Sequence, residues 1–363
     1  MEDSVDPPVC QAGGQPLMPD PVRIALVGLG WWGRKMLAVL EAASDEIAVV
    51  RAVEPDIGSA MALCAEKGIP LSADYADALR DPAVEAVVLA TPHALHSAQI
   101  EAAIRAGRHI FCEKPLALTA VEAARSVTLC RDAGLVLGMG HERRWEPPIA
   151  DLLAKADARQ LGRIHQIEAN FSHDKFLSLD PGNWRLKADQ APAGGMTATG
   201  IHLLDLSVRL LGPAESVLSH CERLSSDLPQ GDTVAAYVKF QRGGTAYVSA
   251  SLANPFMSRF TVYGSKGWVD IRDKAHVEAP DGWVVTSATA GRPIVTEEVG
   301  PAEPVKDNLV AFARAVRGLA PYPITGDELV NTIALLEAVF KSASSGRIET
   351  VPEPAPAEME TVS

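Results

Sequence analysis

The sequence predicts an α/β fold with two domains: an N-terminal doubly wound parallel sheet, then an α+β domain with a large, mostly antiparallel open sheet. Three observations support this prediction. Apolar runs alternate with helical patterns through the first half of the 363-residue chain, as in proteins built from strand–helix–strand units. A glycine-rich hexapeptide joins the first apolar run to the first helical pattern. After residue 141, short alternating stretches separated by turn residues replace this rhythm.

The first apolar run, VRIALV at residues 22–27, is continuous and rich in β-branched residues, as expected for a parallel strand buried on both faces. The same reasoning predicts strands at 47–53, 84–90, 108–112 and 135–139. One-sided apolar patterns predict helices at 34–43, 57–67, 94–106 and 120–133, three of which are followed by glycine stop signals, Gly68, Gly107 and Gly134. We therefore expect residues 21–141 to form a Rossmann domain with right-handed crossovers.

The second half begins with a predicted helix at 147–158, a strand at 164–172 and a helix at 200–211. Alternating or β-branched stretches then predict strands at 216–224, 232–241, 245–252, 259–263, 268–271 and 283–286. Turn signals at 242–244 and 281–282 favour antiparallel neighbours. Helices at 305–318 and 326–344 follow, so residues 142–350 are expected to form one α/β domain. The proline-rich ends, 1–20 and 351–363, are expected to be flexible.

The composition argues against several classes of protein. Hydrophobic residues make up 47% and charged residues 22% of the chain, which is typical of a soluble globular protein. No apolar run approaches the length of a membrane span, and no secretion signal is recognisable. The formal net charge of −13 argues against nucleic-acid binding. Five scattered cysteines without a Cys-x-x-Cys pair favour free thiols in the cytoplasm and predict no metal site.

The hexapeptide GLGWWG has the spacing G-x-G-x-x-G at Gly28, Gly30 and Gly33. It follows a buried strand and opens a helix, which is the context that a dinucleotide-binding turn requires. Gly28 permits the tight turn, Gly30 lets the backbone approach a pyrophosphate, and Gly33 lets the helix pack closely on the strand. The helix N-terminus adds amide donors for the phosphates. We therefore expect this turn, which also contains Trp31 and Trp32, to hold the cofactor.

Glu54 lies 21 residues beyond Gly33, at the end of the second predicted strand. A carboxylate there can accept both ribose hydroxyls of NAD, and it repels the 2′-phosphate of NADP. No arginine follows Glu54 closely, so the sequence favours NAD over NADP. Ligands bind outside the carboxyl ends of parallel strands, so the loop after 84–90 is expected to line the nicotinamide ribose with Thr91, Pro92, His93 and His96. For each histidine, a role in packing or capping is about equally open.

Glu113 and Lys114 directly follow the strand at 108–112 and therefore lie at the same crevice. A lysine that is desolvated there, beside oxidised nicotinamide, should have a lowered pKa. Such a lysine can take a hydroxyl proton as hydride leaves the same carbon. We therefore predict that Lys114 is the catalytic base and that Glu113 borders the cofactor.

Residues 21–345 resemble the glucose–fructose oxidoreductase/inositol dehydrogenase (Gfo/Idh/MocA) family. The resemblance rests on four features with matching order and spacing: the glycine turn, Thr91-Pro92 with His96, the tripeptide at 113–115, and GGMTATGIHLLDL at 194–206. It implies a Rossmann domain and a substrate-binding domain whose open sheet forms dimers or tetramers. It also implies metal-free oxidation or reduction of sugars, inositols and related polyols. In this pattern Lys114 transfers the proton, and His202 is the second catalytic or substrate-orienting group.

One position departs from the family pattern. Many members carry Asp-x-Gly-x-His in this segment, whereas this chain has Ala198 four residues before His202. Thr197 or Thr199 can supply a hydroxyl in place of the carboxylate, and Asp205 lies three residues after His202. The departure leaves the substrate and the proton relay open.

Further substrate contacts are expected from residues near these motifs. Arg144 lies in the charged junction between the two predicted domains, and Trp184 and Arg185 precede the glycine-rich loop. Trp184 can pack on a sugar face, and either arginine can hold hydroxyls or a carboxylate. Three more candidates lie near the end of the strand at 164–172, namely Asn170, His173 and Lys175.

The leading interpretation is an NAD(P)-dependent oxidoreductase that transfers hydride between nicotinamide and a secondary alcohol or ketone of a sugar, inositol or related polyol. A second interpretation is a dehydrogenase of a non-sugar ring diol of the cis-dihydrodiol type. A third is a non-catalytic NAD(P)-binding regulator. The presence of Lys114 and His202 favours an enzyme over a regulator. The absence of the family aspartate, replaced by Ala198, leaves the regulator as an alternative interpretation.

Overall fold

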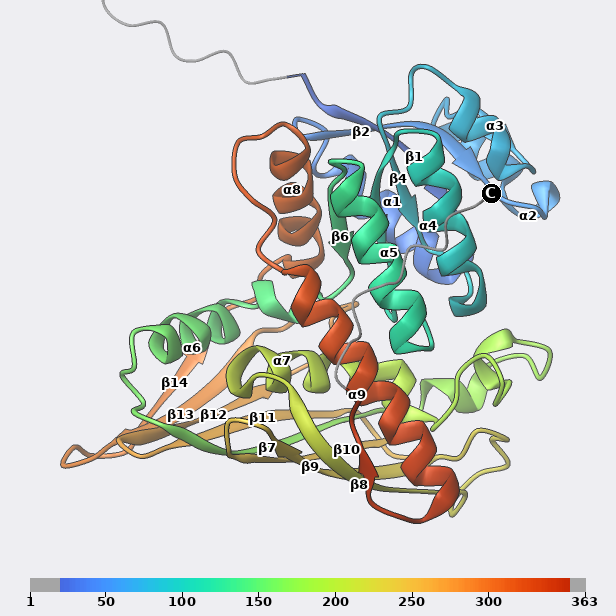
Figure 1. Cartoon of the computed structure of the whole chain (residues 1–363). Helices are drawn as coiled ribbons and strands as arrows, with labels where there is room; N and C mark the ends of the chain where they lie inside the picture. Colours follow the sequence, from blue (N-terminus) through green and yellow to red (C-terminus); the bar gives the residue numbers. More distant parts are fainter. Residues whose placement is uncertain (1–19, 353–363) are drawn as a thin grey trace, which may run out of the picture.

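The computed structural model describes residues 20–352 of the chain. Residues 1–19 and 353–363, which hold most of the two ends expected to be flexible, lie outside the described residues. A smaller sheet with its helices forms the upper half of Figure 1, and a larger sheet forms the base of the molecule. Within residues 20–352, no helix is both long and apolar enough to cross a membrane.

The first sheet has six parallel strands in the order β3-β2-β1-β4-β5-β6. This order confirms the predicted doubly wound dinucleotide-binding fold. The strands are β1 (Val22–Val27), β2 (Ile47–Val53), β3 (Leu71–Ser72), β4 (Ala86–Leu89), β5 (His109–Cys112) and β6 (Leu137–Met139). Between them lie α1 (Trp31–Glu41), α2 (Ile57–Glu66), α3 (Tyr75–Arg80), α4 (His96–Arg105) and α5 (Ala120–Asp132). The sequence did not predict β3 or α3, because two and six residues are too few to show a clear period.

The second sheet has nine strands in the order β14-β13-β12-β11-β7-β10-β9-β8-β15. Only β7 and β10 pair in parallel, which confirms the predicted, mostly antiparallel open sheet. Its strands are β7 (Ile164–Ser172), β8 (Ala214–Glu222), β9 (Thr233–Phe240), β10 (Thr245–Ser251), β11 (Met257–Gly264), β12 (Gly267–Asp273), β13 (Trp283–Thr289), β14 (Val295–Val299) and β15 (Glu349–Thr350). The sequence did not predict β14, whose side chains are nearly all exposed, or the two-residue β15.

Among residues 20–352, helices cover one face of the larger sheet and leave the other face open. The helices α6 (Pro147–Asp157), α7 (Ile201–Leu211) and α9 (Gly326–Ser345) lie above it in Figure 1. Alternate side chains of β9, such as Val238 and Phe240, are fully buried on the covered side. On the open side, the exposed rings of Tyr237 and Tyr247 lie 5.0 Å apart, next to polar and charged side chains such as Arg259. The open face is therefore mixed in character, with apolar side chains among ion pairs.

Helix α8 (Pro304–Val316) follows the second sheet in the sequence but packs against the first sheet. Its Phe312 is fully buried, with its ring 5.6 Å from the ring of Phe111 in β5. Gly138 in β6 leaves room for this contact, because a Cβ there would lie 2.7 Å from the Phe312 ring. Helix α8 therefore packs with the core of the first sheet, although it belongs to the stretch 142–350 that was expected to form the second domain.

Replacing Phe312 with alanine should lower the free energy of unfolding by about 3–5 kcal/mol, because a large ring is removed from a packed core. Urea unfolding followed by circular dichroism measures this loss. Leu319→Ala is the matched control, since Leu319 is 55% exposed, and it should change the free energy by less than about 0.5 kcal/mol. Equal effects of the two substitutions would mean that α8 does not belong to the first core.

Candidate active site

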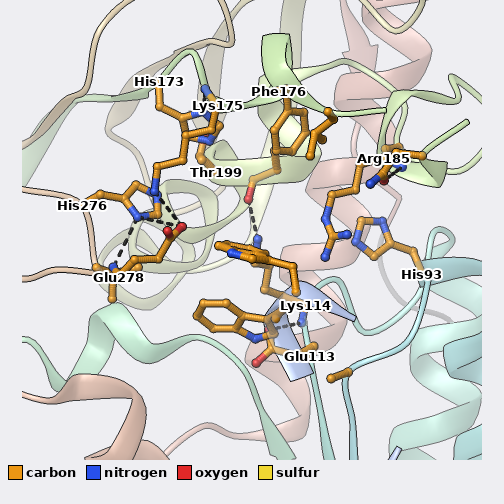
Figure 2. A pocket seen from close by; sticks show the side chains of 18 of the residues that line it. His93, Glu113, Lys114, His173, Lys175, Phe176, Arg185, Thr199, His276 and Glu278 are labelled. Atoms are coloured by element: carbon orange, nitrogen blue, oxygen red, sulfur yellow. Dashed lines mark hydrogen bonds and ion pairs between the residues drawn. The ribbon is translucent and has the colours of Figure 1, made fainter. Parts of the chain in front are cut away.

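A pocket with a volume of about 430 Å³ lies where the carboxyl ends of β1, β4 and β5 face the second half of the chain. Figure 2 shows side chains from both halves pointing into it. The first half contributes Trp31, Trp32, Thr91, His93, Glu113 and Lys114. Among the contributions of the second half are Glu142, Trp184, Arg185, Thr199 and His202. Most of the predicted site residues are therefore brought together in one place.

The glycine turn at one end of the pocket fits a dinucleotide. Gly28 has a φ of +89°, and a Cβ there would lie 2.8 Å from the carbonyl oxygen of Ala90. A Cβ on Gly33 would lie 1.8 Å from the carbonyl oxygen of Gly28, so helix and turn touch. In the part of the chain that the structure describes, no atom lies within 4 Å of a Cβ on Gly30, and no side chain caps helix α1. The first amides of α1 are therefore open to an anion such as a pyrophosphate.

Glu54 lies at the end of β2, beside the glycine turn. Its Oε2 accepts a hydrogen bond from the Leu29 amide at 2.8 Å, and its Oε1 accepts one from the Asp56 amide at 3.2 Å. Each carboxylate oxygen keeps a further acceptor position for a ribose hydroxyl. The sequence missed Arg34, which reaches the same region from α1 and donates to the carbonyl oxygens of Leu29 and Ser59.

The loop after β4 divides into residues that line the pocket and residues that support it. Thr91 and His93 line the pocket, and the rings of His93 and Trp184 form a T-shaped pair with centroids 4.5 Å apart. His96 is fully buried, and its two ring nitrogens lie 2.7 Å from the Pro115 carbonyl oxygen and 3.0 Å from that of Thr91. His96 therefore holds two loops together and does not line the pocket itself. Pro92, which precedes a short 3₁₀ turn, is not part of the lining either.

Lys114 follows β5 and lines the pocket. Its Nζ donates a hydrogen bond to the carbonyl oxygen of Ala198, and a cis peptide bond joins Lys114 to Pro115. Burial lowers the pKa of the Lys114 amine, while the nearby carboxylates of Glu142 and Glu113 partly oppose this effect. A lysine in this environment loses its proton more readily than one in water, as the base role requires.

Glu113 lies next to the glycine turn, directly before Lys114. It is 7% exposed, and its Oε2 accepts a long hydrogen bond of 3.4 Å from the Lys114 amide. Gly140 makes room for it, because a Cβ on Gly140 would lie 2.6 Å from the same carboxylate oxygen. Burial raises the pKa of Glu113, with Trp32 and Lys114 opposing this shift.

His202 lies in the first turn of α7 and faces the same pocket. Its Nε2 is 3.7 Å from a carboxylate oxygen of Glu142, and its Nδ1 has no hydrogen-bond partner among the described residues. Burial is the main cause that lowers the pKa of His202 well below its ordinary value, and the charge of Lys114 adds to it. The imidazole is therefore neutral at physiological pH, so one nitrogen can donate and the other can accept a hydrogen bond.

Trp184 and Arg185 close the pocket from the loop that follows β7. The Arg185 guanidinium stacks over the Trp184 ring, 4.4 Å from its centroid, and lies 5.9 Å from the ring centroid of Trp31. Burial lowers the pKa of Arg185 to about 10, which leaves it positively charged at neutral pH. No hydrogen bond of this guanidinium occurs among the described residues, so its donors are open to a ligand.

Arg144 was predicted to bind substrate, but the structure places it outside the pocket lining. Its guanidinium donates two hydrogen bonds to Asp205, at 2.7 and 2.8 Å, and one to Glu328 at 3.0 Å. All three side chains are at most one-fifth exposed. The expectation for Arg144 is therefore corrected, because both partners in α7 and α9 already occupy its donors.

The candidates to replace a carboxylate at position 198 are all engaged elsewhere. The Asp205 carboxylate pairs with Arg144, and the Thr197 hydroxyl donates to the Pro192 carbonyl. The Thr199 hydroxyl donates to backbone carbonyls of Phe171 and Gly195, although Thr199 does line the pocket. None of these three side chains therefore takes the place of the missing carboxylate beside Lys114.

Another wall of the pocket comes from the segment that follows β7 and from the loop between β12 and β13. Lys175 pairs with Glu278 at 2.7 Å, and His276 lies 3.2 Å from the same carboxylate (Figure 2). Burial lowers the pKa of His173 to about 4 and that of His276 to about 3. The sequence indicated His173 and Lys175, but nothing in it pointed to His276 or Glu278. His276 and Glu278 lie between β12 and β13, and they reach the pocket because β12 pairs with β11 and β11 pairs with β7, which is distant in sequence.

Asn170 faces away from the pocket and forms a hydrogen bond with Ser249 on the open side of the sheet. Phe171, the next residue in β7, lines the pocket instead. Successive side chains of a strand point to opposite faces, which explains both positions. Across residues 20–352, no group of three or more His, Cys, Asp or Glu side chains is arranged to hold a metal ion.

Fold and site together define a dinucleotide-binding oxidoreductase. Residues 22–141 match the model of an oxidoreductase family with an NAD-binding Rossmann fold, and residues 150–270 match the GFO/IDH/MocA C-terminal domain. The chain is 32% identical to 1,5-anhydro-D-fructose reductase of Ensifer adhaerens, over 90% of this chain and 97% of that protein. The chain therefore belongs to the Gfo/Idh/MocA family, as the sequence motifs indicated.

Two further comparisons agree with this assignment. D-xylose 1-dehydrogenase (NADP(+)) 2 of Haloferax volcanii is 27% identical, over 86% of this chain and 94% of that protein. The structure of levoglucosan dehydrogenase in complex with NADH and levoglucosan superposes with a TM-score of 0.80 and 20% identity, over 92% of this chain and all of that one. At this identity the second comparison supports the fold alone. The cofactors in these names include both NADP and NADH.

Proposed function

We propose that this protein is an NAD(P)-dependent oxidoreductase that transfers hydride between nicotinamide and a secondary alcohol or ketone of a sugar, inositol or related polyol. The observation that carries the proposal is the convergence of Lys114, His202 and the open glycine turn on one pocket. The family membership and the named sugar substrates of the two relatives support it. A test of many sugars, inositols and sugar acids for NADH or NADPH production identifies the substrate.

The proposed mechanism assigns one task to each of two residues. A bound nicotinamide dinucleotide supplies the hydride acceptor. The neutral amine of Lys114 takes the hydroxyl proton of the alcohol, since its lowered pKa keeps a fraction unprotonated. The neutral imidazole of His202 holds the same oxygen through a hydrogen bond, so that the carbonyl forms in a fixed orientation.

The charges of the lining favour an uncharged substrate rich in hydroxyls. Three cationic side chains (Lys114, Lys175, Arg185) face three acidic ones (Glu113, Glu142, Glu278). The lining histidines are neutral because burial lowers the pKa of each, and neutral imidazoles can donate to and accept from hydroxyls. Aromatic rings such as those of Phe171 and Trp184 offer flat apolar surfaces of the kind that pack on sugar rings.

A ring diol without further hydroxyls is the second candidate substrate. The apolar side chains of Phe171, Phe176, Leu179 and Val277 in the lining favour it. The substrate panel therefore includes a cis-dihydrodiol. A wild-type protein that binds the cofactor but oxidises no member of the panel would favour the non-catalytic regulator.

We further propose NAD as the preferred cofactor, the cytoplasm as the compartment, and a homodimer or homotetramer formed through the open sheet face. Glu54 beside the glycine turn supports NAD. The free thiols of Cys64, Cys112, Cys130 and Cys221 are consistent with a reducing compartment. Exposed apolar side chains on the sheet support the oligomer.

Lys114→Ala should reduce turnover by about a hundredfold or more, the usual contribution of a general base, while the fold and cofactor binding remain. Lys114→Arg should not restore turnover, because guanidinium stays protonated. Steady-state kinetics on a substrate from the panel give the rates, and quenching of tryptophan fluorescence gives cofactor affinity. Lys67→Ala, a change in an ion pair on the surface, is the control. An active Lys114→Ala variant would remove the assigned base.

Glu54→Ala should narrow the preference for NAD over NADP, because the acceptor for the ribose hydroxyls and the repulsion of a 2′-phosphate are both lost. Titration of the two cofactors into each protein measures the ratio of dissociation constants. Asp45→Asn is the control, since Asp45 is exposed at the opposite, amino-terminal end of β2. A wild-type protein that binds NADP more tightly would contradict the NAD assignment and leave the fold unaffected.

Light scattering should give a mass of two or four times 38.5 kDa for the wild-type protein. Tyr237→Glu should shift this mass towards the monomer, because a charge would enter the apolar part of the contact. Leu319→Glu, at an exposed position on another surface, should leave the mass unchanged. A wild-type monomer at all accessible concentrations would refute the oligomer.

A further inference from the structure

Glu142 occupies an unusual position at the junction between the two halves. It begins a short 3₁₀ helix (Glu142–Trp145) after β6, is 5% exposed and lines the pocket. Within residues 20–352 its carboxylate receives no hydrogen bond from another residue. Its near neighbour is His202, whose Nε2 lies 3.7 Å away. A buried acid that faces a cavity in this way is costly unless it has a task or a ligand.

The two residues after Glu142 fix its position. The Arg143 guanidinium donates to Ser258 at 2.7 Å and to Asp273 at 3.1 Å, and it pairs with Glu146 at 3.2 Å. Arg144 is held by Asp205 and Glu328, as described above. Both arginines point into the protein, which leaves Glu142 as the charged group that the junction presents to the pocket.

Several charged and titratable groups face Glu142. Glu113 and Lys114, which follow β5, line the same pocket as Glu142, and His202 in α7 lies 3.7 Å from it. Arg143 and Glu146 belong to its own segment and also act on its charge. Burial and the like charge of Glu113 raise the pKa of Glu142 to about 7, with Lys114 opposing. Conversely, Glu142 is the charge that contributes most to raising the pKa of Lys114. At neutral pH this carboxylate can therefore both gain and lose a proton.

Glu113, the other acid beside Lys114, is less suited to exchange protons with the substrate side. Its carboxylate packs against Gly140 and accepts from the Lys114 backbone amide. It therefore faces the backbone and the glycine turn. The chain has no acid at position 198, where Ala198 offers only its carbonyl oxygen to Lys114.

We propose that Glu142 is the proton-relay residue of this pocket and acts through Lys114. The inference rests on the proposed oxidoreductase function. As the alcohol is oxidised, its O–H bond breaks and an N–H bond forms on Lys114. Among the described residues no direct hydrogen bond or ion pair joins Lys114 and Glu142, so the proton then passes from the ammonium through a water molecule in the pocket to a carboxylate oxygen of Glu142, beside His202, and from there to solvent. One proton is released for each hydride removed, and the Lys114 amine returns to its neutral form.

The first test needs neither substrate nor turnover. Lys114 is labelled with acetic anhydride at a series of pH values, and mass spectrometry of its peptide gives the pH of half-labelling. Glu142→Gln keeps the size of the side chain and removes the charge, so the half-labelling pH should fall by about one unit. Asp45→Asn, far from the pocket, should leave it unchanged. An unchanged labelling curve in Glu142→Gln would overturn the proposal.

The second test uses a substrate from the panel and follows kcat for its oxidation against pH. The relay needs an ionised Glu142, so the kcat of the wild-type protein should fall as the pH drops below about 7. In Glu142→Gln the base is still Lys114, whose pKa is then lower, so the acidic limb should move to lower pH. This variant should also lower kcat at least about tenfold and change KM less than about threefold. Glu142→Asp should restore part of kcat, which a purely structural role would not explain.

The outcomes separate this proposal from the proposed function. Suppose that Lys114→Ala loses turnover while Glu142→Gln keeps the pH profile of the wild-type protein. This result would refute the relay role of Glu142 and would leave the proposed oxidoreductase function standing. A protein that binds no dinucleotide would overturn the proposed function, whereas the labelling experiment would still report whether Glu142 controls the charge of Lys114.

Discussion

The arrangement of the pocket depends on one buried interaction, the pairing of Arg144 with Asp205 and Glu328. Because these groups are withdrawn from water, the loss of one partner would leave a charge without compensation, which is far more costly than the loss of a surface ion pair. The interaction ties the junction after β6 to α7 and α9. Helix α7 carries His202, and the junction directly follows β6, which pairs with β5, the strand that ends just before Lys114. The same contact therefore holds the helix of His202 against the junction from which Glu142 faces the pocket.

Much of the fold could be predicted because its signals are local. Long strands and amphipathic helices show their period in the sequence, and their observed ends lie within three residues of the predicted ones. The parallel character of the first sheet followed from the strand–helix rhythm, because such units join parallel strands through right-handed crossovers. The short β3 and α3, the exposed β14 and the return of α8 to the first sheet were missed. In these elements either the period is too short or the packing partner lies far away in the sequence.

The candidate site was predictable where a residue is placed by its own strand end. Lys114, Glu113 and the glycine turn follow from the geometry of parallel strands, and the structure brings them to one pocket. Arg144 and Glu142 could not be distinguished in this way, because both belong to one charged junction. Asp205 and Glu328, which lie far away in the sequence, bind Arg144 and turn it away from the cavity, so that Glu142 faces the cavity instead. His276 and Glu278 reach the site through the β12–β13 loop, and no local pattern marks such a contact.

The return of α8 has a consequence for how this architecture can be divided. The chain crosses from the first sheet to the second at the junction and comes back after β14, so the dinucleotide-binding half is discontinuous in sequence. A fragment cut at residue 141 would expose the apolar surface around Phe111 and Gly138 that α8 covers. Such a surface favours aggregation of the isolated fragment. Exchange of this half between related proteins would therefore have to transfer two separate stretches of chain, the second containing residues 304–316.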